Sequence, residues 1–329
     1  MPALIAIAQF FVLPALFWLA VMLIAGFLGA LHPALDSFAH FRHHLAAAGL
    51  IVALIAVICG RGRWRWTGVP VLILAVFSLW TVWPFLAPHS ATPEAARPSG
   101  AGPYTLLQMN LLYDAQQRPA LDLIDTIDAD IVLLQEVSRP WRDAVNTLSE
   151  SYPHQVYCDR GSTVGGLAIL SRHPFGADAM ECFGRSVMLR QGVLIDGRPL
   201  TVISQHLAWP WPYEQWNDLA SIAAALQRAA PNGTASPPVL VAGDFNAVPW
   251  SAAVQRYARL AGVRPVHGVG GTWTDLVVPS AMLRWAGLPI DNVLTSPGVR
   301  VLSIDTLPPT ASDHRPIVMQ FSLEQGVVQ

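Results

Sequence analysis

The sequence GDFN at residues 243–246 directly follows the apolar run at residues 239–242. Because alternate side chains of a strand share one face, Asp244 and Asn246 are expected to point together into a cleft, with Phe245 anchored on the other side. A tight turn is the structural alternative, since Gly, Asp and Asn are common turn residues. The segment is therefore a candidate site that other parts of the chain must support.

Residues able to do chemistry recur at the ends of other apolar segments. Each has an ordinary explanation as a turn residue, a surface charge or a satisfied core histidine. Catalytic groups nevertheless concentrate in loops at one edge of a rigid sheet, so the recurrence favours a single site. The further candidates are Asn110, Glu136, His206, Asp291, Asp313 and His314.

The elements that must position these residues are many strands and a few helices. Helices are expected at residues 119–127, 141–148, 214–230 and 251–261. Strands are expected at residues 104–110, 130–136, 154–158, 166–171, 187–195, 200–205, 239–243, 290–295, 299–304 and 316–322. Asp196-Gly197 predicts a hairpin turn. Because the order is not strictly βαβ, the pattern predicts an α+β fold with sheets packed on each other and helices outside.

The polar segments together resemble the endonuclease/exonuclease/phosphatase superfamily, which includes DNase I, neutral sphingomyelinases, inositol polyphosphate 5-phosphatases and abasic-site nucleases. The resemblance covers about residues 104–322 and implies two mixed β-sheets packed face to face with outer helices, a four-layer sandwich. GDFN and SDH are modest signals alone but highly specific in this order. The matching segments are Asn110, Gln135-Glu136, residues 166–172 (GLAILSR), His206-Leu207, residues 243–246, Ile290-Asp291 and residues 312–314 (SDH).

This resemblance implies metal-dependent cleavage of phosphate esters. Phosphoester cleavage accumulates negative charge that a divalent metal offsets, and Mg²⁺ prefers oxygen ligands. Glu136 would be the principal ligand of Mg²⁺, with Asn110 assisting and Mn²⁺ as a substitute metal.

The resemblance also assigns roles to the remaining polar residues. Asp244 would activate or orient the attacking water, and Asn246 would hold the phosphate through its amide. The two histidines, His206 and His314, would donate hydrogen bonds to the phosphoryl oxygens and the leaving group. Either Asp313 or Asp291 would fix and charge an imidazole.

Two differences from the abasic-site nucleases indicate which branch of the superfamily this chain resembles. Abasic-site nucleases carry an acidic residue two positions after the first Asn, where this chain has Leu112, and they lack the His-Leu motif found here at His206-Leu207. The DNase I, sphingomyelinase and phosphatase branches are therefore the closer kin.

The first 87 residues are apolar enough to form a membrane anchor. Uncharged runs at residues 3–31, 45–60 and 69–87 predict three transmembrane helices, since about 20 apolar residues span a bilayer. The second run is short, although Arg42 could snorkel and lengthen it. A cleaved signal peptide fits the first run poorly, because that run is too long and lacks a basic start.

Charge around these runs predicts their orientation. Arg61, Arg63 and Arg65 lie between the second and third runs, which places that loop in the cytoplasm by the positive-inside rule. We therefore expect a multi-pass protein of a bacterial inner membrane with its catalytic domain outside the cytoplasm. Residues 88–103 are rich in Pro, Ala and Gly and predict a linker, and residues 104–329 are expected to form the catalytic domain.

Charge and aromatic residues bear on the substrate. From His89 onward 16 Arg face 21 Asp plus Glu, a formal net charge of −5, whereas a protein gripping long nucleic acid is normally basic. No stable nucleic-acid partner is expected. Trp209 and Trp211 lie just after His206 and either pack on the domain or form an aromatic lip for substrate near a bilayer. A phosphoester of a lipid or small molecule is the favoured substrate, with nuclease activity outside the cytoplasm as the alternative.

Other interpretations remain open at this point. A catalytically silent binding module ranks behind an enzyme, because Glu136, Asp244 and His314 are all present. A transport role for the apolar runs is disfavoured, because none contains an acidic or basic residue. Cys158 and Cys182 fall in the exported domain and either pair or stay as thiols. The oligomeric state is not indicated.

Overall fold

The computed structural model describes residues 2–60, 62–89, 101–159, 161, 163–230, 237–273 and 279–324. The chain divides into two compact units. The first comprises Met1–Pro84 with the short segments Pro210–Pro212 and Trp250–Ala252, and the second comprises Phe85–Trp209, Tyr213–Pro249 and Ala253–Gln329.

The first unit is helical. Its helices are α1 (Pro2–Phe27), α2 (Pro33–His40), α3 (Arg42–Cys59) and α4 (Gly68–Leu86), with 3₁₀ turns η1 (Gly29–Leu31) and η2 (Gly62–Thr67). Three segments are long and apolar enough to cross a membrane, Phe10–Phe27, Arg42–Cys59 and Gly62–Leu86, so the prediction of three such helices is confirmed. The second begins earlier than its apolar run, at Arg42, whose Nη2 donates to the carbonyl of Gly26 at 2.7 Å.

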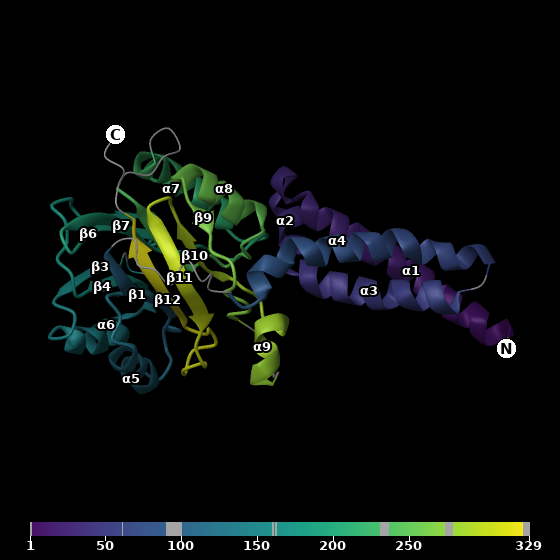
Figure 1. The fold of residues 1–329 in the computed structure, drawn as a ribbon, viewed down its shortest axis with the longest axis horizontal. Helices are drawn as coiled ribbons and strands as arrows, with labels where there is room; N and C mark the ends of the chain where they lie inside the picture. The colour runs from purple at the N-terminus through teal and green to yellow at the C-terminus, as the bar shows by residue number, and fades with distance from the viewer. Residues whose placement is uncertain are drawn as a thin grey trace. The chain divides into compact units, whose positions relative to one another are not determined.

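The second unit contains two six-stranded mixed sheets (Figure 1). The first sheet has the order β11-β12-β1-β2-β4-β3 and the second the order β5-β6-β7-β8-β10-β9. The strands of the first sheet are β1 (Ala101–Asn110), β2 (Ile131–Val137), β3 (His154–Cys158), β4 (Gly166–Ser171), β11 (Val299–Thr306) and β12 (Ile317–Leu323). The strands of the second are β5 (Glu181–Phe183), β6 (Met188–Ile195), β7 (Arg198–His206), β8 (Val239–Asp244), β9 (Arg264–Pro265) and β10 (Asp291–Thr295).

Each sheet has one parallel pair at its centre, and its other described pairings are antiparallel. Strand β1 runs parallel to β2, and β7 runs parallel to β8. A parallel pair needs a crossover connection, and here helices α5 (Arg118–Ile127) and α7 (Gln215–Ala229) provide it. The carboxyl ends of β1 and β2, and those of β7 and β8, are therefore brought together within their sheets.

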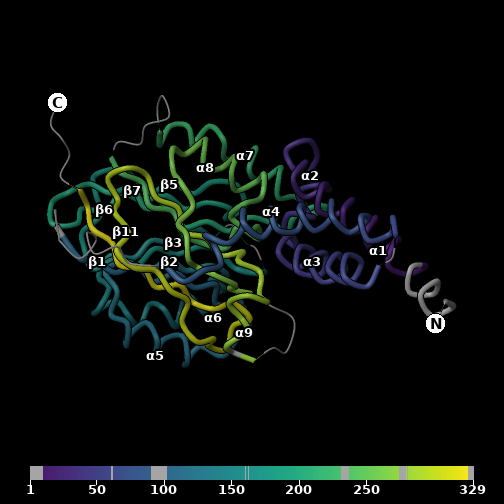
Figure 2. The backbone as a smooth tube through the Cα atoms, turned by 45° about the vertical axis from the view of Figure 1, so that its right-hand side comes forward, coloured from purple at the N-terminus to yellow at the C-terminus, as the bar shows by residue number. Residues whose placement is uncertain are grey.

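The sheets and helices form four layers. The core between the sheets contains Leu106 of β1, Leu133 of β2 and Leu240 of β8, which meet because alternate side chains of each strand point toward the facing sheet. A second core packs β7 and β8 against α7 and α8 (Ala252–Ala261), and a third packs β1 and β2 against α5 and α6 (Arg139–Val145). Figures 1 and 2 show the two helix pairs on opposite outer sides of the strands. The predicted α+β sandwich of face-to-face mixed sheets is confirmed.

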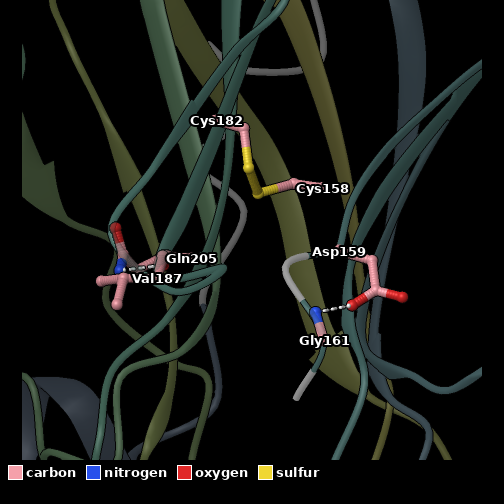
Figure 3. Close-up of a disulfide and its surroundings, with 6 residues drawn as sticks. All are labelled: Cys158, Asp159, Gly161, Cys182, Val187 and Gln205. Carbon is pink, nitrogen blue, oxygen red and sulfur yellow. Dashed lines mark hydrogen bonds between the residues drawn. A yellow bond between two sulfur atoms is a disulfide. The ribbon is translucent and has the colours of Figure 1, made fainter.

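A disulfide joins the edge strands of the two sheets. Cys158 ends β3 and Cys182 lies in β5, and their sulfur atoms are bonded (Figure 3). The sequence left this pairing open, because it depends on two edge strands meeting across the sandwich.

Most elements agree with the sequence prediction, and the differences lie in short or terminal segments. Helix α6 begins at Arg139, ahead of the predicted residue 141, and gives way to the 3₁₀ turn η3 (Asn146–Leu148). Proline fits the first turn of a helix because the missing N–H has no partner there anyway, so Pro140 lies inside this helix. The sequence did not predict β5, β9 or α9 (Ser280–Ala286).

Candidate active site

Both sheets become polar at the same end of their facing surfaces. In β1, Leu106 contributes to the core between the sheets, and Leu107 contributes to the third core, beneath helices α5 and α6. The two-residue period of the strand therefore carries Gln108 and Asn110 onto the inner face. Parallel pairing sets Asn110 beside Gln135 of β2.

The second sheet repeats this arrangement. Leu240 and Ala242 of β8 lie in the core between the sheets, so Asp244 follows them on the inner face. Register pairs His206 of β7 with Asp244, and antiparallel β10 sets Asp291 opposite the same residue. Strand pairing thus assembles three of the predicted residues side by side.

Glu136 reaches the site through a bulge in β2. The register shifts between Gln135 and Val137, and Glu136 has a positive φ of 59°. Its Oε1 accepts from Asn110 Nδ2 at 3.0 Å and its Oε2 accepts from the backbone N–H of Tyr113 at 3.1 Å. A bulge re-aims a side chain next to a site, which places this carboxylate among the inner-face residues.

Backbone strain concentrates around the same site. In the described part of the chain, six residues other than glycine have positive φ. Four of them, Leu112, Glu136, Ser186 and Asn246, line one cleft. Such conformations cost free energy and cluster at functional sites.

The GDFN segment is both a tight turn and part of the candidate site, the two interpretations that its sequence allowed. A Cβ at Gly243 would lie 2.0 Å from the carbonyl oxygen of Gln205, so the close approach of β7 requires glycine there. Asp244 Oδ1 accepts from the backbone N–H of Asn246 at 2.7 Å, which closes a tight turn. Asn246 donates from Nδ2 to the carbonyl of Leu207 at 2.8 Å, and Phe245 is fully buried on the other side.

Asp291 is the carboxylate that holds His314. Its Oδ2 lies 2.8 Å from His314 Nδ1, and its Oδ1 accepts from Gln108 Nε2 at 2.9 Å. Burial alone would lower the pKa of His314, but the charges of Asp291 and Asp244 outweigh burial and raise that pKa to about 10. The site therefore favours an imidazolium at His314.

The two buried aspartates differ in protonation. Burial would raise the pKa of Asp291, but the charge of His314 and the hydrogen bonds from His314, Thr272 and Gln108 outweigh it and hold the pKa below its usual value. For Asp244 burial prevails over the opposing charge of His314 and raises the pKa to about 6. Asp244 is thus the carboxylate better suited to accept a proton near neutral pH.

Asp313 has a different partner. Its Oδ2 accepts from Trp273 Nε1 at 2.9 Å. Of the two aspartates that the sequence left open as the partner of an imidazole, Asp291 takes that position, and Asp313 instead holds an indole.

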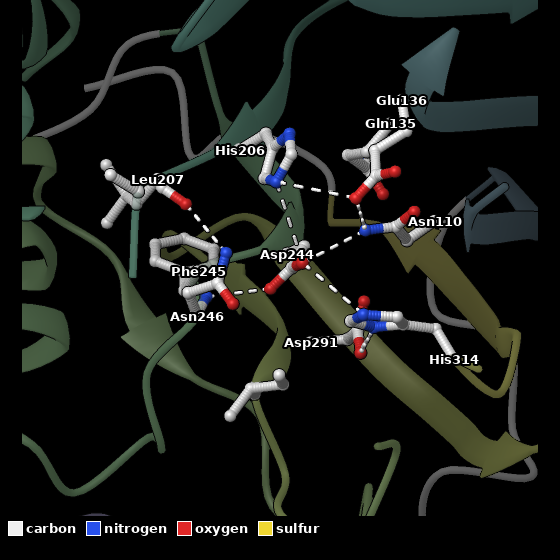
Figure 4. A network of polar contacts seen from close by, with 12 residues as sticks. Asn110, Gln135, Glu136, His206, Leu207, Asp244, Phe245, Asn246, Asp291 and His314 are labelled. Atoms are coloured by element: carbon white, nitrogen blue, oxygen red, sulfur yellow. Dashed lines mark hydrogen bonds and ion pairs between the residues drawn. The ribbon is translucent and has the colours of Figure 1, made fainter. Parts of the chain in front are cut away.

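Three side chains form a group that could hold a metal ion. Suitable atoms of Glu136, His206 and Asp244 all lie within 4.8 Å of one another. His206 Nε2 lies 4.0 Å from Glu136 Oε1 and 3.7 Å from Asp244 Oδ2 (Figure 4). Two carboxylates fit the preference of Mg²⁺ or Mn²⁺ for oxygen. Asn110 turns its amide nitrogen toward both carboxylates at 3.0 Å, and its role as a ligand stays a prediction.

Glu136, His206 and Asp244 line a cleft of about 600 Å³. Trp209 lines it, whereas Trp211 does not and belongs to the first unit. The lining residues are Leu112, Tyr113, Glu136, Val164, Gly165, Arg185, Ser186, Val187, His206, Leu207, Ala208, Trp209, Tyr213, Glu214, Asp218, Asp244, Asn246, Asp313 and His314.

A family model matches residues 107–314, most of the second unit, and its description is Endonuclease/Exonuclease/phosphatase family. The chain belongs to this family. Members of the endonuclease/exonuclease/phosphatase family hydrolyse phosphoester bonds, and the residues brought together here lie inside or at the end of the matched segment. No curated protein matches the chain significantly.

Solved structures of this family share the fold. An endonuclease/exonuclease/phosphatase from Bacteroides vulgatus matches with a TM-score of 0.56 at 17% identity, over 68% of this chain and all (100%) of that chain. D. rerio TDP2 complexed with a single-strand DNA product matches with a TM-score of 0.54 at 19% identity, covering 68% and 100%. The human Nocturnin catalytic domain with bound sulfate matches with a TM-score of 0.51 at 19% identity, covering 71% and 100%.

Several residues of this family site were missed from the sequence. Gln108 and Thr272 support Asp291, and Ser204 accepts from Gln135, which the sequence had already indicated, at 3.0 Å. Gln108 could have been found from the sequence, because a buried glutamine that interrupts an apolar strand needs a polar partner. Thr272 had no such signal, since it lies outside the predicted strands.

Proposed function

We propose that the second unit is a divalent-metal-dependent hydrolase of phosphate esters. The observation that carries the proposal is the convergence of Glu136, His206 and Asp244 within 4.8 Å of one another, beside a histidine held by a buried carboxylate. Asp244 is almost fully buried and still lines an open cleft, a placement that suits contact with a bound substrate.

Each side chain of the site has a separate role in the proposed hydrolysis. A bound Mg²⁺ or Mn²⁺ would offset charge on the phosphoryl oxygens, and Glu136 would be its principal ligand. Asp244, held by Asn110 and by the backbone of Asn246, orients the attacking water and accepts its proton. His314 donates from Nε2 to a phosphoryl or leaving-group oxygen, with Asp291 stabilising its charge.

We also propose that this site acts outside the cytoplasm of a bacterium, from an inner-membrane anchor. Support comes from the arginines between the second and third apolar segments and from the Cys158–Cys182 disulfide, since disulfides persist in oxidising compartments. The substrate proposed is a phosphoester of a lipid or small molecule.

A nucleic acid is the alternative substrate, because the fold is shared with D. rerio TDP2 bound to single-strand DNA. The cleft lining argues against it. Among the described lining residues, one arginine, Arg185, faces five carboxylates, those of Glu136, Glu214, Asp218, Asp244 and Asp313, whereas nucleic-acid grooves neutralise phosphates with basic side chains.

The test is hydrolysis of bis-p-nitrophenyl phosphate by the purified full chain. Turnover should require Mg²⁺ or Mn²⁺, disappear with EDTA and return when metal is restored. Glu136→Gln should lose at least about 100-fold in kcat/KM, the scale of a missing electrostatic group. Glu150→Gln, a change at an exposed carboxylate, is the matched control. Full activity in EDTA or in Glu136→Gln would refute the proposal.

A further inference from the structure

The cleft has, beside charged lining residues such as Arg185 and Glu214, a group of exposed apolar and aromatic side chains that take no part in the chemistry proposed above. Trp209, Tyr213, Tyr113 and Val164 all line it. Their exposed fractions are 44%, 67%, 40% and 37%, although the same unit buries Trp141 and Phe245 almost completely. Single exposed apolar residues are ordinary, but a group gathered around one cleft marks a ligand surface.

Trp209 is held in place by a chain of contacts that ends beside His314. Its ring centroid lies 5.4 Å from that of Trp273 in an edge-to-face arrangement of 74°. Trp273 Nε1 donates to Asp313 at 2.9 Å, and the backbone of Trp273 bridges that of His314. The indole of Trp209 is therefore fixed relative to the catalytic histidine.

The backbone before Trp209 is also fixed. Asp218 Oδ2 accepts from the N–H of Ala208 at 2.9 Å, and Gln215 Nε2 donates to the carbonyl of Ala208 at 3.2 Å. An exposed indole that is braced from two directions loses little conformational entropy on binding a ligand. Such bracing suits a binding wall better than an incidental surface residue.

We propose that Trp209 binds an apolar hydrocarbon group of the phosphoester substrate and sets substrate specificity. Trp273 and Asp313 are positioning residues that hold the Trp209 indole. The inference rests on the proposed hydrolase function and names its substrate class, a phosphoester that carries a hydrocarbon chain. A membrane lipid and a soluble alkyl ester share that chemistry.

The test compares two esters with the same leaving group, p-nitrophenyl methyl phosphate and p-nitrophenyl octyl phosphate, using the full chain in amphipol. Burial of part of the octyl chain should raise kcat/KM at least about tenfold over the methyl ester. Trp209→Ala should remove most of this preference through the KM of the octyl ester. Trp285→Ala, at an indole of similar exposure (40%) outside the cleft lining, should keep the preference.

Variants of Trp273 and Asp313 test the positioning role through the preference for the octyl ester. Trp273→Phe keeps a ring but loses the N–H donor, and Asp313→Ala loses the acceptor, so both should weaken the octyl preference severalfold. Asp313→Asn retains an acceptor oxygen and should restore it. Equal loss in Asp313→Asn and Asp313→Ala would remove Asp313 from the assignment.

The possible results distinguish failure of the proposed hydrolase function from failure of the proposed role of Trp209. If no ester is hydrolysed with metal, the proposed function fails. If both esters are hydrolysed with equal kcat/KM, or if Trp209→Ala keeps the octyl preference, the function stands and the inference is overturned. Faster cleavage of a single-stranded oligonucleotide than of the octyl ester would also overturn it. Dioctanoyl phosphatidylglycerol in mixed micelles, compared with monomeric octyl ester, then distinguishes a lipid source from a soluble one.

Discussion

Two histidine–aspartate pairs of the second unit can be compared, and only one of them lies in the cleft. His314 Nδ1 lies 2.8 Å from Asp291 Oδ2, and His173 Nε2 lies 2.9 Å from Asp130 Oδ1. The side chains of the first pair are 6% and 0% exposed, and those of the second 18% and 26%. Almost equal distances therefore occur in quite different surroundings.

The neighbours of each pair explain the difference. Asp291 holds Nδ1, which leaves Nε2 of His314 facing Asp244 at 3.7 Å. Asp130 holds Nε2 of His173 and also accepts from the backbone N–H of Thr105 at 2.7 Å, so this pair ties strand ends together. A pair becomes catalytic when its second nitrogen faces a reacting centre, and distance within the pair does not decide it.

The largest expected difference between the pairs is the effect of removing the histidine. His314→Ala should lower kcat/KM on the chromogenic diester by at least about 100-fold, since a proton donor to the reacting phosphate is lost. His173→Ala should stay within about threefold of the parent, because its ring lies outside the cleft lining and provides no general acid or base there. Circular dichroism of both variants checks that each is folded. Similar losses of kcat/KM in the two variants would contradict a catalytic role that is specific to His314.

Replacing the aspartates should give a smaller difference. Asp291→Asn removes the charge that stabilises the His314 imidazolium and should cost about tenfold to 100-fold in kcat. Asp130→Asn keeps an oxygen that can accept from Thr105, so little change is expected. The measurement is kcat at saturating metal for both variants, and an unaffected Asp291→Asn would remove this aspartate from the mechanism.

The acid limb of the pH profile should follow Asp244, the neighbour of the cleft pair. The pKa of Asp244 is raised to about 6, so its basic form is lost as pH falls through that value. The pKa of His314 is raised to about 10, so its acidic form persists at neutral pH. We expect kcat/KM to be about tenfold lower at about pH 5 than at about pH 7, in the parent and in His173→Ala alike. A flat profile between those values would contradict the base role of Asp244.

Much of this site could be predicted from the sequence because its signals are local. Asp244, His206 and Asn110 each end an apolar strand, and the two-residue period of strands puts them on one face. The choice between Asp291 and Asp313 could not be predicted, because Asp313 is next to His314 in the chain, whereas Asp291 lies 23 residues away and reaches the imidazole only through the fold.

Long-range contacts account for the other gaps. The bulge that aims Glu136 needs strand β4 as its partner, and the edge-to-face contact of Trp209 with Trp273 joins residues far apart in the chain. Strands β5 and β9 have three and two residues, too few to show a period. Sequence patterns of strands therefore indicated which residues meet at the candidate site, but not the contacts that orient them.

The disulfide should have the smallest effect on turnover, although the segments around it border the cleft. Val164 and Arg185 line the cleft and lie a few residues from Cys158 and Cys182, which cross-link the two edge strands. The double variant Cys158→Ser/Cys182→Ser should keep kcat/KM within about twofold, because hydrogen bonds and strand pairing hold the cleft pair and its neighbours. Its free energy of unfolding should fall by about 3 kcal/mol, the scale for a loop of this length, as measured by denaturant titration. A large loss of kcat/KM in a folded double variant would show that the cross-link, as well as the His314–Asp291 pair, sets the geometry of the cleft.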